Sequence, residues 1–285
     1  MEKSRIPKFY QESIERRLEI LRERDILSDE DYISLLNGLN VLKPDEADRM
    51  IENVIGVFGL PLALGLNFVV NGKPHVIPMV VEEPSIVAAV SSAAKTVRNS
   101  GGFTSTSDDP ILIGQVQIVD IENPGRAKNA ILQNKEEILN LANSLHPNMV
   151  ARGGGATDLE VIIHPGASYR GDMVIVHLLV DTRDAMGANL VNSMCEGVAP
   201  LIEKITNGKV FLRILSNLAD RALVKAQCII PVENLDFNET DGREVRDGII
   251  LANEFASVDS YRAATHNKGI MNGIDPVAIA TGNDW

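Results

Sequence analysis

The sequence predicts an α+β protein in which a large, discontinuous α/β domain carries a smaller inserted domain of the ferredoxin-like type. Between residues 111 and 215, strand and helix patterns alternate in the order β-α-β-β-α-β, which defines the ferredoxin-like unit. A stretch rich in glycine, serine and threonine, residues 101–110, precedes this unit and has the composition of a linker. We therefore expect residues 1–109 and 219–285 to form the large domain and residues 110–218 the small one.

Short helices are expected in the first fifty residues. Apolar residues share one helical face between residues 14 and 21. Ser28 precedes three acidic residues and resembles a capping box that opens a second helix running to Leu39. Pro44 suits the first turn of a third helix. None of these helices has a pattern that indicates chemistry by itself.

A β-hairpin is expected around Asn71-Gly72, because Asn-Gly supplies the positive φ angles of a type I′ turn. Its strands are predicted at residues 67–70 and 75–81. A helix should follow, with Pro84 near its start and small apolar residues along its length.

The inserted domain is expected to begin with a strand and to alternate regularly. Aliphatic periodicity predicts its elements in this order: strand 111–121, helix 127–145, strands 158–164 and 173–181, helix 185–205 and strand 210–215. Aromatic residues make up only 4% of the chain, so valine, isoleucine, leucine and alanine must form the core.

Composition excludes several classes of protein. The net charge of −12 argues against general binding of nucleic acid or of an anionic membrane surface, although it leaves room for a local basic pocket. The longest apolar stretch, residues 56–70, is too short to span a bilayer. Neither the two cysteines nor the five histidines have metal-ligand spacing, so no metal is expected. With no secretory signal at the N-terminus, we expect a cytoplasmic protein.

Two neighbouring carboxylates, Glu82 and Glu83, follow the second hairpin strand. Partial burial at a strand end raises the pKa of a carboxyl group and can make it a general acid near neutral pH. The alternative is that both carboxylates only mark the solvated end of the strand. The residues alone leave both interpretations open.

A second candidate segment, residues 184–189 (Asp-Ala-Met-Gly-Ala-Asn), precedes a predicted helix. Asp184 can cap that helix, and Gly187 near its N-terminus permits an anionic ligand to approach free backbone N–H groups. The alternative is a capped helix with a packing glycine. The three glycines at 153–155 are typical of a turn.

A polar run at residues 261–273 combines Arg262, His266 and Lys268 on an expected loop or helix end. In an acidic protein, such a cluster favours a site for an oxyanion or a carboxylate, the alternative being a solvated loop. Asp284 lies beside the single tryptophan and indicates little by itself.

Taken together, these segments resemble one family, class II 3-hydroxy-3-methylglutaryl-coenzyme A (HMG-CoA) reductase. The blocks that carry the resemblance occur in order along the chain: residues 52–56 (Glu-Asn-Val-Ile-Gly), 82–85 (Glu-Glu-Pro-Ser), 184–189, 216–220 (Ser-Asn-Leu-Ala-Asp), 266–269 (His-Asn-Lys-Gly) and 282–285 (Gly-Asn-Asp-Trp). The family's ferredoxin-like cofactor-binding domain, inserted in a larger substrate domain, agrees with the organisation described above.

The resemblance implies a reaction that interconverts HMG-CoA with mevalonate and CoA through two hydride transfers, with NAD or NADP as the cofactor. Some members run it in the degradative direction. By resemblance, Lys268 stabilises the oxyanion, Glu83 supplies and removes the proton, and Asp284 tunes both. A cation and a proton donor at the carbonyl are what such a reduction requires.

The remaining site residues are also implied by the resemblance. Arg262 and Ser85 would hold the free carboxylate of the substrate, and Asn217 and Asn272 would position Lys268 and the carbonyl group. The resemblance also assigns substrate binding to two further residues, Glu52 and Asn53. Because the two domains meet across subunits in this family, a homodimer or an assembly of dimers is implied.

The dinucleotide should face the segment containing Asp184, Met186, Gly187 and Asn189. Members that use NAD often carry an acidic residue near the end of the small domain's first helix, where it repels a 2′-phosphate. His146 occupies that position here and Arg152 is close by, so use of NADP or of both cofactors is expected. The alternative is that His146 only interacts with the helix dipole.

Family members continue past the Gly-Asn-Asp-Trp block to a mobile flap, whose histidine protonates the CoA thiolate. We therefore expect this chain to be truncated and to lack that acid. Two alternatives follow: a non-catalytic dimer that binds CoA or a dinucleotide, and a CoA-dependent acyl transferase with Cys195 as nucleophile. The position of Cys195 in the middle of a predicted helix argues against the transferase, because buried cysteines are usually inert.

Overall fold

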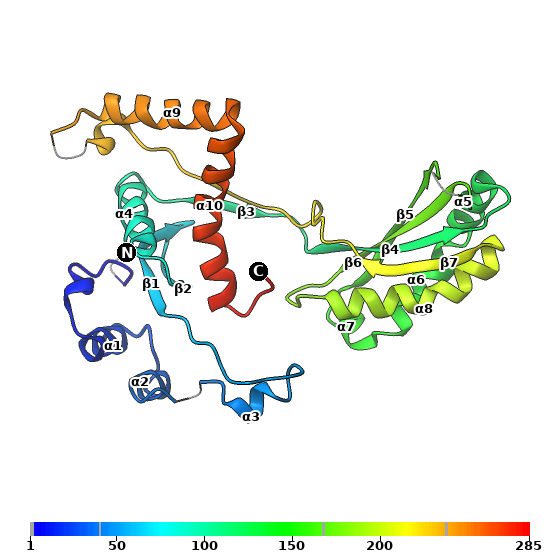
Figure 1. The fold of residues 1–285 in the computed structure, drawn as a ribbon, viewed down its shortest axis with the longest axis horizontal. Coiled ribbons are helices and arrows are strands. Elements are labelled where there is room, and N and C mark those ends of the chain that lie inside the picture. Colours follow the sequence, from blue (N-terminus) through cyan, green and yellow to red (C-terminus); the bar gives the residue numbers. More distant parts are fainter. Residues whose placement is uncertain (1–2, 40, 167–168, 237–238) are drawn as a thin grey trace. The chain divides into compact units, whose positions relative to one another are not determined.

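A computed structural model describes residues 3–39, 41–166, 169–236 and 239–285. The chain divides into two compact units (Figure 1), the larger formed by Met1–Ser105 with Ala226–Trp285 and the smaller by Thr106–Lys225. The smaller unit, coloured green to yellow in Figure 1, extends a few residues beyond the expected segment 110–218 at both ends.

The smaller unit is a four-stranded antiparallel sheet with helices. Its elements are β4 (Ile111–Val119), α5 (Pro124–Gln133), α6 (Lys135–Ser144), α7 (Pro147–Ala151), β5 (Gly155–His164), β6 (Met173–Asp181), α8 (Ala188–Thr206) and β7 (Lys209–Leu215). The strands are ordered β5-β6-β4-β7, and each neighbouring pair is antiparallel. The sequence therefore predicted every strand of this unit.

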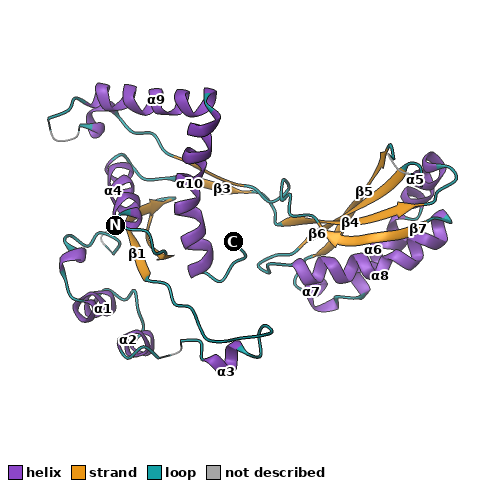
Figure 2. Ribbon diagram, in the orientation of Figure 1, coloured by secondary structure: helices purple, strands orange, loops and turns teal. Residues whose placement is uncertain are grey.

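One face of this sheet forms the core of the unit. Side chains alternate between the two faces of a strand, so every second residue of β4 and β6 points toward the helices. Helices α6 and α8 lie on that side (Figure 2). The completely buried strand residues are aliphatic, as expected from the scarcity of aromatics: Val116, Ile118, Val174, Val176, Leu178 and Val180.

Two helix predictions in this unit need correction. The helix expected at 127–145 is interrupted at Asn134, which ends α5 and precedes α6. The side-chain amide of Asn134 donates to the carbonyl of Ala130 at 2.8 Å, and asparagine commonly competes with regular helix in this way. Helix α8 begins at Ala188, three residues later than expected, because Gly187 has a φ of 82° that a helix does not allow.

The larger unit contains the N-terminal helices, a hairpin and two long helices. Its elements are the 3₁₀ turn η1 (Phe9–Gln11), α1 (Ile14–Glu23), α2 (Asp29–Leu36), α3 (Pro44–Ala47), β1 (Leu62–Val70), β2 (Lys73–Val80), α4 (Ile86–Asn99), η2 (Val232–Leu235), α9 (Gly242–Val258) and α10 (Ser260–Ala280). The hairpin is confirmed, with positive φ at Asn71 and Gly72. Ser28 caps α2 by accepting from the N–H of Asp31 at 3.0 Å.

The two chain segments that connect the units pair with one another. Strand β3 (Thr104–Ser107) hydrogen-bonds to β8 (Val224–Gln227) in a two-stranded sheet. Next to it, the N–H of Asp108 donates to the carbonyl of Leu223 at 2.9 Å. The stretch 101–110 is therefore not wholly a linker. Its strand has a partner more than a hundred residues away, which local composition does not reveal.

Helix α9 exposes large apolar side chains to solvent. They include Ile249, Leu251, Phe255 and Val258, of which Val258 is 85% exposed. Leu251, Phe255 and Val258 are four and three residues apart and share one face of the helix, and exposed apolar faces of this kind mark interaction sites. Among the described residues, no helix combines the length and the apolarity needed to cross a bilayer.

Candidate active site

The larger unit brings Glu83 and Lys268 into direct contact. Glu83 lies in the turn between β2 and α4, and Lys268 lies on α10, which packs against β2 and α4. The Nζ atom of Lys268 is 2.5 Å from Oε2 of Glu83, and Nδ2 of Asn272 lies 3.4 Å from the same oxygen. One carboxylate oxygen thus faces both a cation and an amide.

Local backbone structure explains this arrangement. Lys268 and Asn272 are four residues apart on α10, so they share one helix face. On the other side, Ser85 is the N-cap of α4 and has a φ of 71°, which turns the chain sharply after Glu83. The polar run 261–273 was expected on a loop or helix end, and that prediction is wrong. The run lies inside the 21-residue helix α10, and added Cβ atoms at Gly269 and Gly273 would meet open space.

The charge environment of Glu83 also differs from the expectation. Partial burial was proposed as the cause of acid behaviour, but both Glu82 and Glu83 are exposed, the Glu83 side chain by 42%. What distinguishes Glu83 from its neighbour is the ammonium group of Lys268. The pair places a cationic side chain and a carboxyl group within one hydrogen bond of each other, and the reduction of a carbonyl group needs a positive charge and an acid–base group of this kind.

The other residues expected near this pair lie on separate segments. Arg262 lies in the first turn of α10, where its N–H donates to the side chain of the N-cap Asp259 at 2.7 Å. Asp284 is exposed after the end of α10, and Glu52 and Asn53 lie in an exposed turn after α3. Among described residues, no hydrogen bond or ion pair joins any of these, or Ser85, to Glu83 or Lys268. The last expected residue, Asn217, lies in the smaller unit, two residues after the end of β7.

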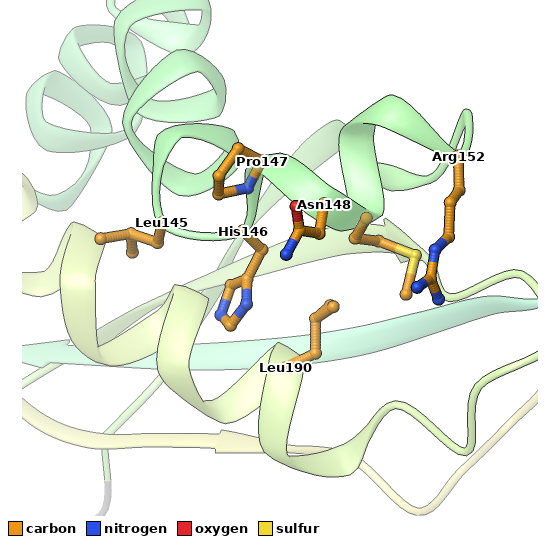
Figure 3. Close-up of a pocket in the computed structure, with 7 residues that line it drawn as sticks. Leu145, His146, Pro147, Asn148, Arg152 and Leu190 are labelled. Atoms are coloured by element: carbon orange, nitrogen blue, oxygen red, sulfur yellow. The ribbon is translucent and has the colours of Figure 1, made fainter.

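A second candidate site is a cavity of about 240 Å³ in the smaller unit, where α7 faces α8 (Figure 3). It is lined by Leu145, His146, Pro147, Asn148, Met149, Arg152 and Leu190. His146 and Arg152, singled out from the sequence, therefore share one cavity. The Nε2 atom of His146 is buried, and no described residue supplies a hydrogen-bond partner for it.

The start of α8 forms one wall of this cavity through Leu190, which Figure 3 shows directed toward His146. Gly187, and not Asp184, is the N-cap of α8, and its cap makes no side-chain hydrogen bond. The expected capping role of Asp184 is therefore wrong. A Cβ atom at Gly187 would collide with Thr182, so glycine is required both by space and by the positive φ. Met186 and Asn189 are exposed on either side of Gly187.

Sequence reasoning missed the apolar lining of the cavity, namely Leu145, Met149 and Leu190. Apolar residues on a helix look the same in sequence whether they face a core or a cavity. The signal that was available was the glycine triplet at 153–155, which fixes the turn after α7. Two of these glycines have positive φ.

The cysteines give no support to an acyl transferase. Cys195 is completely buried in α8, and burial raises the pKa of its thiol to about 12, so almost no thiolate forms near neutral pH. Cys228 is exposed and carries no described partner group that would activate it. Within the described ranges, no cluster of three or more acidic, histidine or cysteine side chains is arranged to hold a metal ion.

Comparison with known proteins decides between these interpretations. The family model for hydroxymethylglutaryl-coenzyme A reductase matches residues 13–285. The chain belongs to this family. A 3-hydroxy-3-methylglutaryl-coenzyme A reductase from Archaeoglobus fulgidus is 51% identical over 99% of the chain. A solved structure of the Streptococcus pneumoniae reductase matches with a TM-score of 0.92 and 44% identity, covering 98% of this chain and 74% of that one.

A further Streptococcus pneumoniae structure with the same TM-score is the class II reductase bound to NADPH in open conformations. The class II resemblance found in the sequence motifs is therefore confirmed. The chain spans 63% of the length of the Archaeoglobus relative and 53% of a 34% identical relative from Borreliella burgdorferi.

Proposed function

We propose that this protein is a class II HMG-CoA reductase that interconverts HMG-CoA with mevalonate and CoA. The observation that carries the proposal is the contact of Lys268 and Asn272 with one carboxylate oxygen of Glu83, in a chain that belongs to the reductase family. Each nicotinamide cofactor would supply one hydride, so two cofactor molecules bound in turn would reduce the thioester first to the aldehyde level, with release of CoA as the thiol, and then to the alcohol.

Lys268 places a positive charge where the carbonyl oxygen becomes negative during each reduction. Glu83 transfers a proton to that oxygen, and the short distance to Lys268 allows the ammonium group to stabilise the carboxylate that remains. Asn272 orients the carboxylate through its amide. Asp284 is proposed to complete this network.

The free carboxylate of the substrate is proposed to bind Arg262 and Ser85. Ser85 is the N-cap of α4 and Arg262 lies in the first turn of α10, and these two helices pack against each other. A guanidinium group binds a carboxylate through two parallel hydrogen bonds, and a serine hydroxyl can add a third. Two further residues are proposed to contact the CoA ester: Glu52 and Asn53.

The smaller unit is proposed to be a ferredoxin-like domain that binds NAD or NADP. Its element order and its strand order β7-β4-β6-β5 support this assignment. The unpartnered Nε2 of His146 and the Arg152 guanidinium in the same cavity suit the 2′-phosphate of NADP. On the other wall, free N–H groups near Gly187 suit the pyrophosphate, with Asp184, Met186 and Asn189 beside them.

A homodimer is proposed as the functional form, because the exposed apolar side chains of α9 need a covering partner. The second candidate function is a non-catalytic protein that binds CoA or a dinucleotide. Both candidates predict binding, but only the reductase predicts turnover.

The test is NADPH or NADH oxidation by the protein with HMG-CoA, and separately with mevaldehyde. A reductase consumes the dinucleotide only when one of these substrates is present. Tight binding of NADPH and of CoA without oxidation of the cofactor would favour the non-catalytic protein instead.

A further inference from the structure

Arg183 occupies an unusual place in the smaller unit. It follows β6 directly and has a φ of 51°, a left-handed conformation that an arginine adopts only at a cost in free energy. Its N–H donates to Oδ1 of Asp181 at 2.9 Å, and its Nε lies 3.5 Å from Oδ2 of the same residue. The Asp181 side chain is only 11% exposed, so this carboxylate depends on a cationic partner.

The same guanidinium also reaches a different loop. Its Nη2 atom donates to the carbonyl of Gly153, in the turn that joins α7 to β5. Gly153 has a φ of 84° and directly follows Arg152. A planar guanidinium can serve two acceptors at fixed angles, which a lysine ammonium on a flexible stem does less well. Arg183 therefore ties the turn after α7 to the end of β6.

Packing continues this link to the wall of the cavity. A Cβ atom at Gly154 would lie 2.7 Å from the carbonyl oxygen of Asp181, 2.8 Å from Sδ of Met149 and 3.1 Å from Cγ of Arg183. Gly154 is thus held between the Arg183 stem and Met149, and Met149 lines the cavity. Because Arg183, Gly154 and Met149 are packed against one another, a displacement of Arg183 should also displace Met149 in the cavity wall.

We propose that Arg183 is a positioning residue for the dinucleotide site. It holds the turn that carries Arg152 against the loop that carries residues 184–189, so that the two sides of the site keep a fixed spacing. This inference rests on the proposed function of the smaller unit as the dinucleotide-binding domain. Arg183 itself is assigned no contact with the cofactor, and its side chain is already engaged with Asp181 and Gly153.

The test measures binding of NADPH and NADH to Arg183→Ala by fluorescence titration, followed by steady-state kinetics. We expect the Kd and the KM for the dinucleotide to rise about tenfold or more, the usual scale for losing a residue that orients a binding group. The value of kcat at saturating cofactor and the KM for HMG-CoA should change less than about threefold. A general loss of folded structure would instead affect all four quantities.

Two further variants separate the link from backbone strain. Arg183→Gly removes the side chain but accepts a positive φ without strain, so it remains folded and should lose the same affinity as Arg183→Ala. Arg183→Lys keeps a positive charge for Asp181 and should recover part of the affinity. The matched control is Arg213→Gln, which removes an exposed arginine paired with Glu196 in the same unit, and it should leave the Kd unchanged.

The possible outcomes distinguish the two proposals. Wild-type protein that binds NADPH, together with Arg183→Gly of equal affinity, would overturn the positioning role and leave the proposed function intact. Failure of the wild-type protein to bind either dinucleotide would overturn the proposed function itself. A tenfold loss in Arg183→Gly with partial recovery in Arg183→Lys would establish the link.

Discussion

Gly114 on β4 directly faces Cys195 on α8, and an added Cβ atom at Gly114 would collide with the cysteine sulfur. The same Cβ would lie 2.8 Å from Cγ1 of Val191. The backbone of β4 therefore lies close to α8 at this glycine, where there is no room for a larger side chain.

Gly114→Ala should destabilise the protein by about 1–3 kcal/mol, because overfilling a packed core forces side chains and backbone to shift. Denaturant unfolding of the variant measures this change. Adding Cys195→Ala should make the double variant less destabilised than the sum of the single changes, since the colliding sulfur is gone. Gly248→Ala in α9, where a Cβ meets open space, is the control and should not destabilise. If the changes in free energy of unfolding of the two single variants simply add in the double variant, Gly114 and Cys195 are not energetically coupled.

Lys268→Ala should lower kcat for HMG-CoA reduction by about 10²–10³, the usual effect of removing one preorganised oxyanion donor. The Kd for NADPH should change much less than kcat, because Lys268 is assigned to the carbonyl oxygen of the substrate and to no contact with the dinucleotide. Lys95→Ala, at an exposed lysine on α4, is the matched control. Turnover of Lys268→Ala close to that of the wild type would rule out the assigned role.

Glu83→Gln should lower kcat by about 10²–10⁴, because glutamine keeps the shape of the side chain but cannot transfer a proton. The adjacent Glu82→Gln removes another exposed carboxylate that has no described contact with Lys268, so it should retain activity. Steady-state kinetics of the two variants with HMG-CoA and mevaldehyde make the comparison. Equal losses in both would assign the effect to local charge and not to proton transfer.

His146→Asp should shift cofactor preference from NADPH toward NADH, since a carboxylate beside the 2′ position repels a phosphate. The measured quantity is the ratio of kcat/KM for the two dinucleotides. His164→Asp, at an exposed histidine that ends β5, places the same charge away from the cavity and should leave the ratio unchanged. If His146→Asp also leaves it unchanged, this position does not contact the ribose.

The free energy of unfolding should depend on pH through the imidazole of His177. Burial lowers the pKa of its imidazole below the 6.5 of an exposed histidine, opposed by the charges of Glu160 and Asp220 and assisted by those of His164 and Arg221. Because the unfolded chain then binds more protons, stability is full above about pH 6.5 and is lost as the pH falls toward the lowered pKa.

Replacing this imidazole should flatten that dependence. His177→Gln should show a shallower fall in the free energy of unfolding between about pH 7 and pH 5 than the wild type. The amide of Gln115, 2.9 Å from Nε2 of His177, can pair with the new side chain. His75→Gln removes an exposed histidine of the larger unit that is not among the groups acting on His177, and it is the control.

The sequence predicted the strands well because each carries its own signal. The hairpin turn at Asn71-Gly72 and the aliphatic alternation of β4 and β6 depend on residues close in the chain. Local patterns singled out Glu83 and Lys268 separately, but only the family motifs linked them as a pair. Its two residues are 185 positions apart, and local pattern placed Lys268 on a loop when it lies inside α10.

What the sequence could not predict arises from tertiary contacts. The backbone of Arg183 is left-handed because Asp181 and Gly153 hold it, and neither contact follows from residue type. Asp184 looked like a helix cap by composition, but the tight fit of Gly187 against Thr182 moved the start of α8. The position of Glu83 at a strand end predicted partial burial of its side chain, but the turn in which it lies is exposed.

The pairing of β3 with β8 brings the entry and the exit of residues 106–225 side by side, since paired strands lie about 5 Å apart. A segment whose two ends meet in this way can be added to or removed from a host chain without stretching the host backbone. Residues 106–225 should therefore be suited to insertion, by gene fusion, into a surface hairpin of another protein. The same geometry offers a simple route by which an ancestral gene could have acquired it in a single insertion.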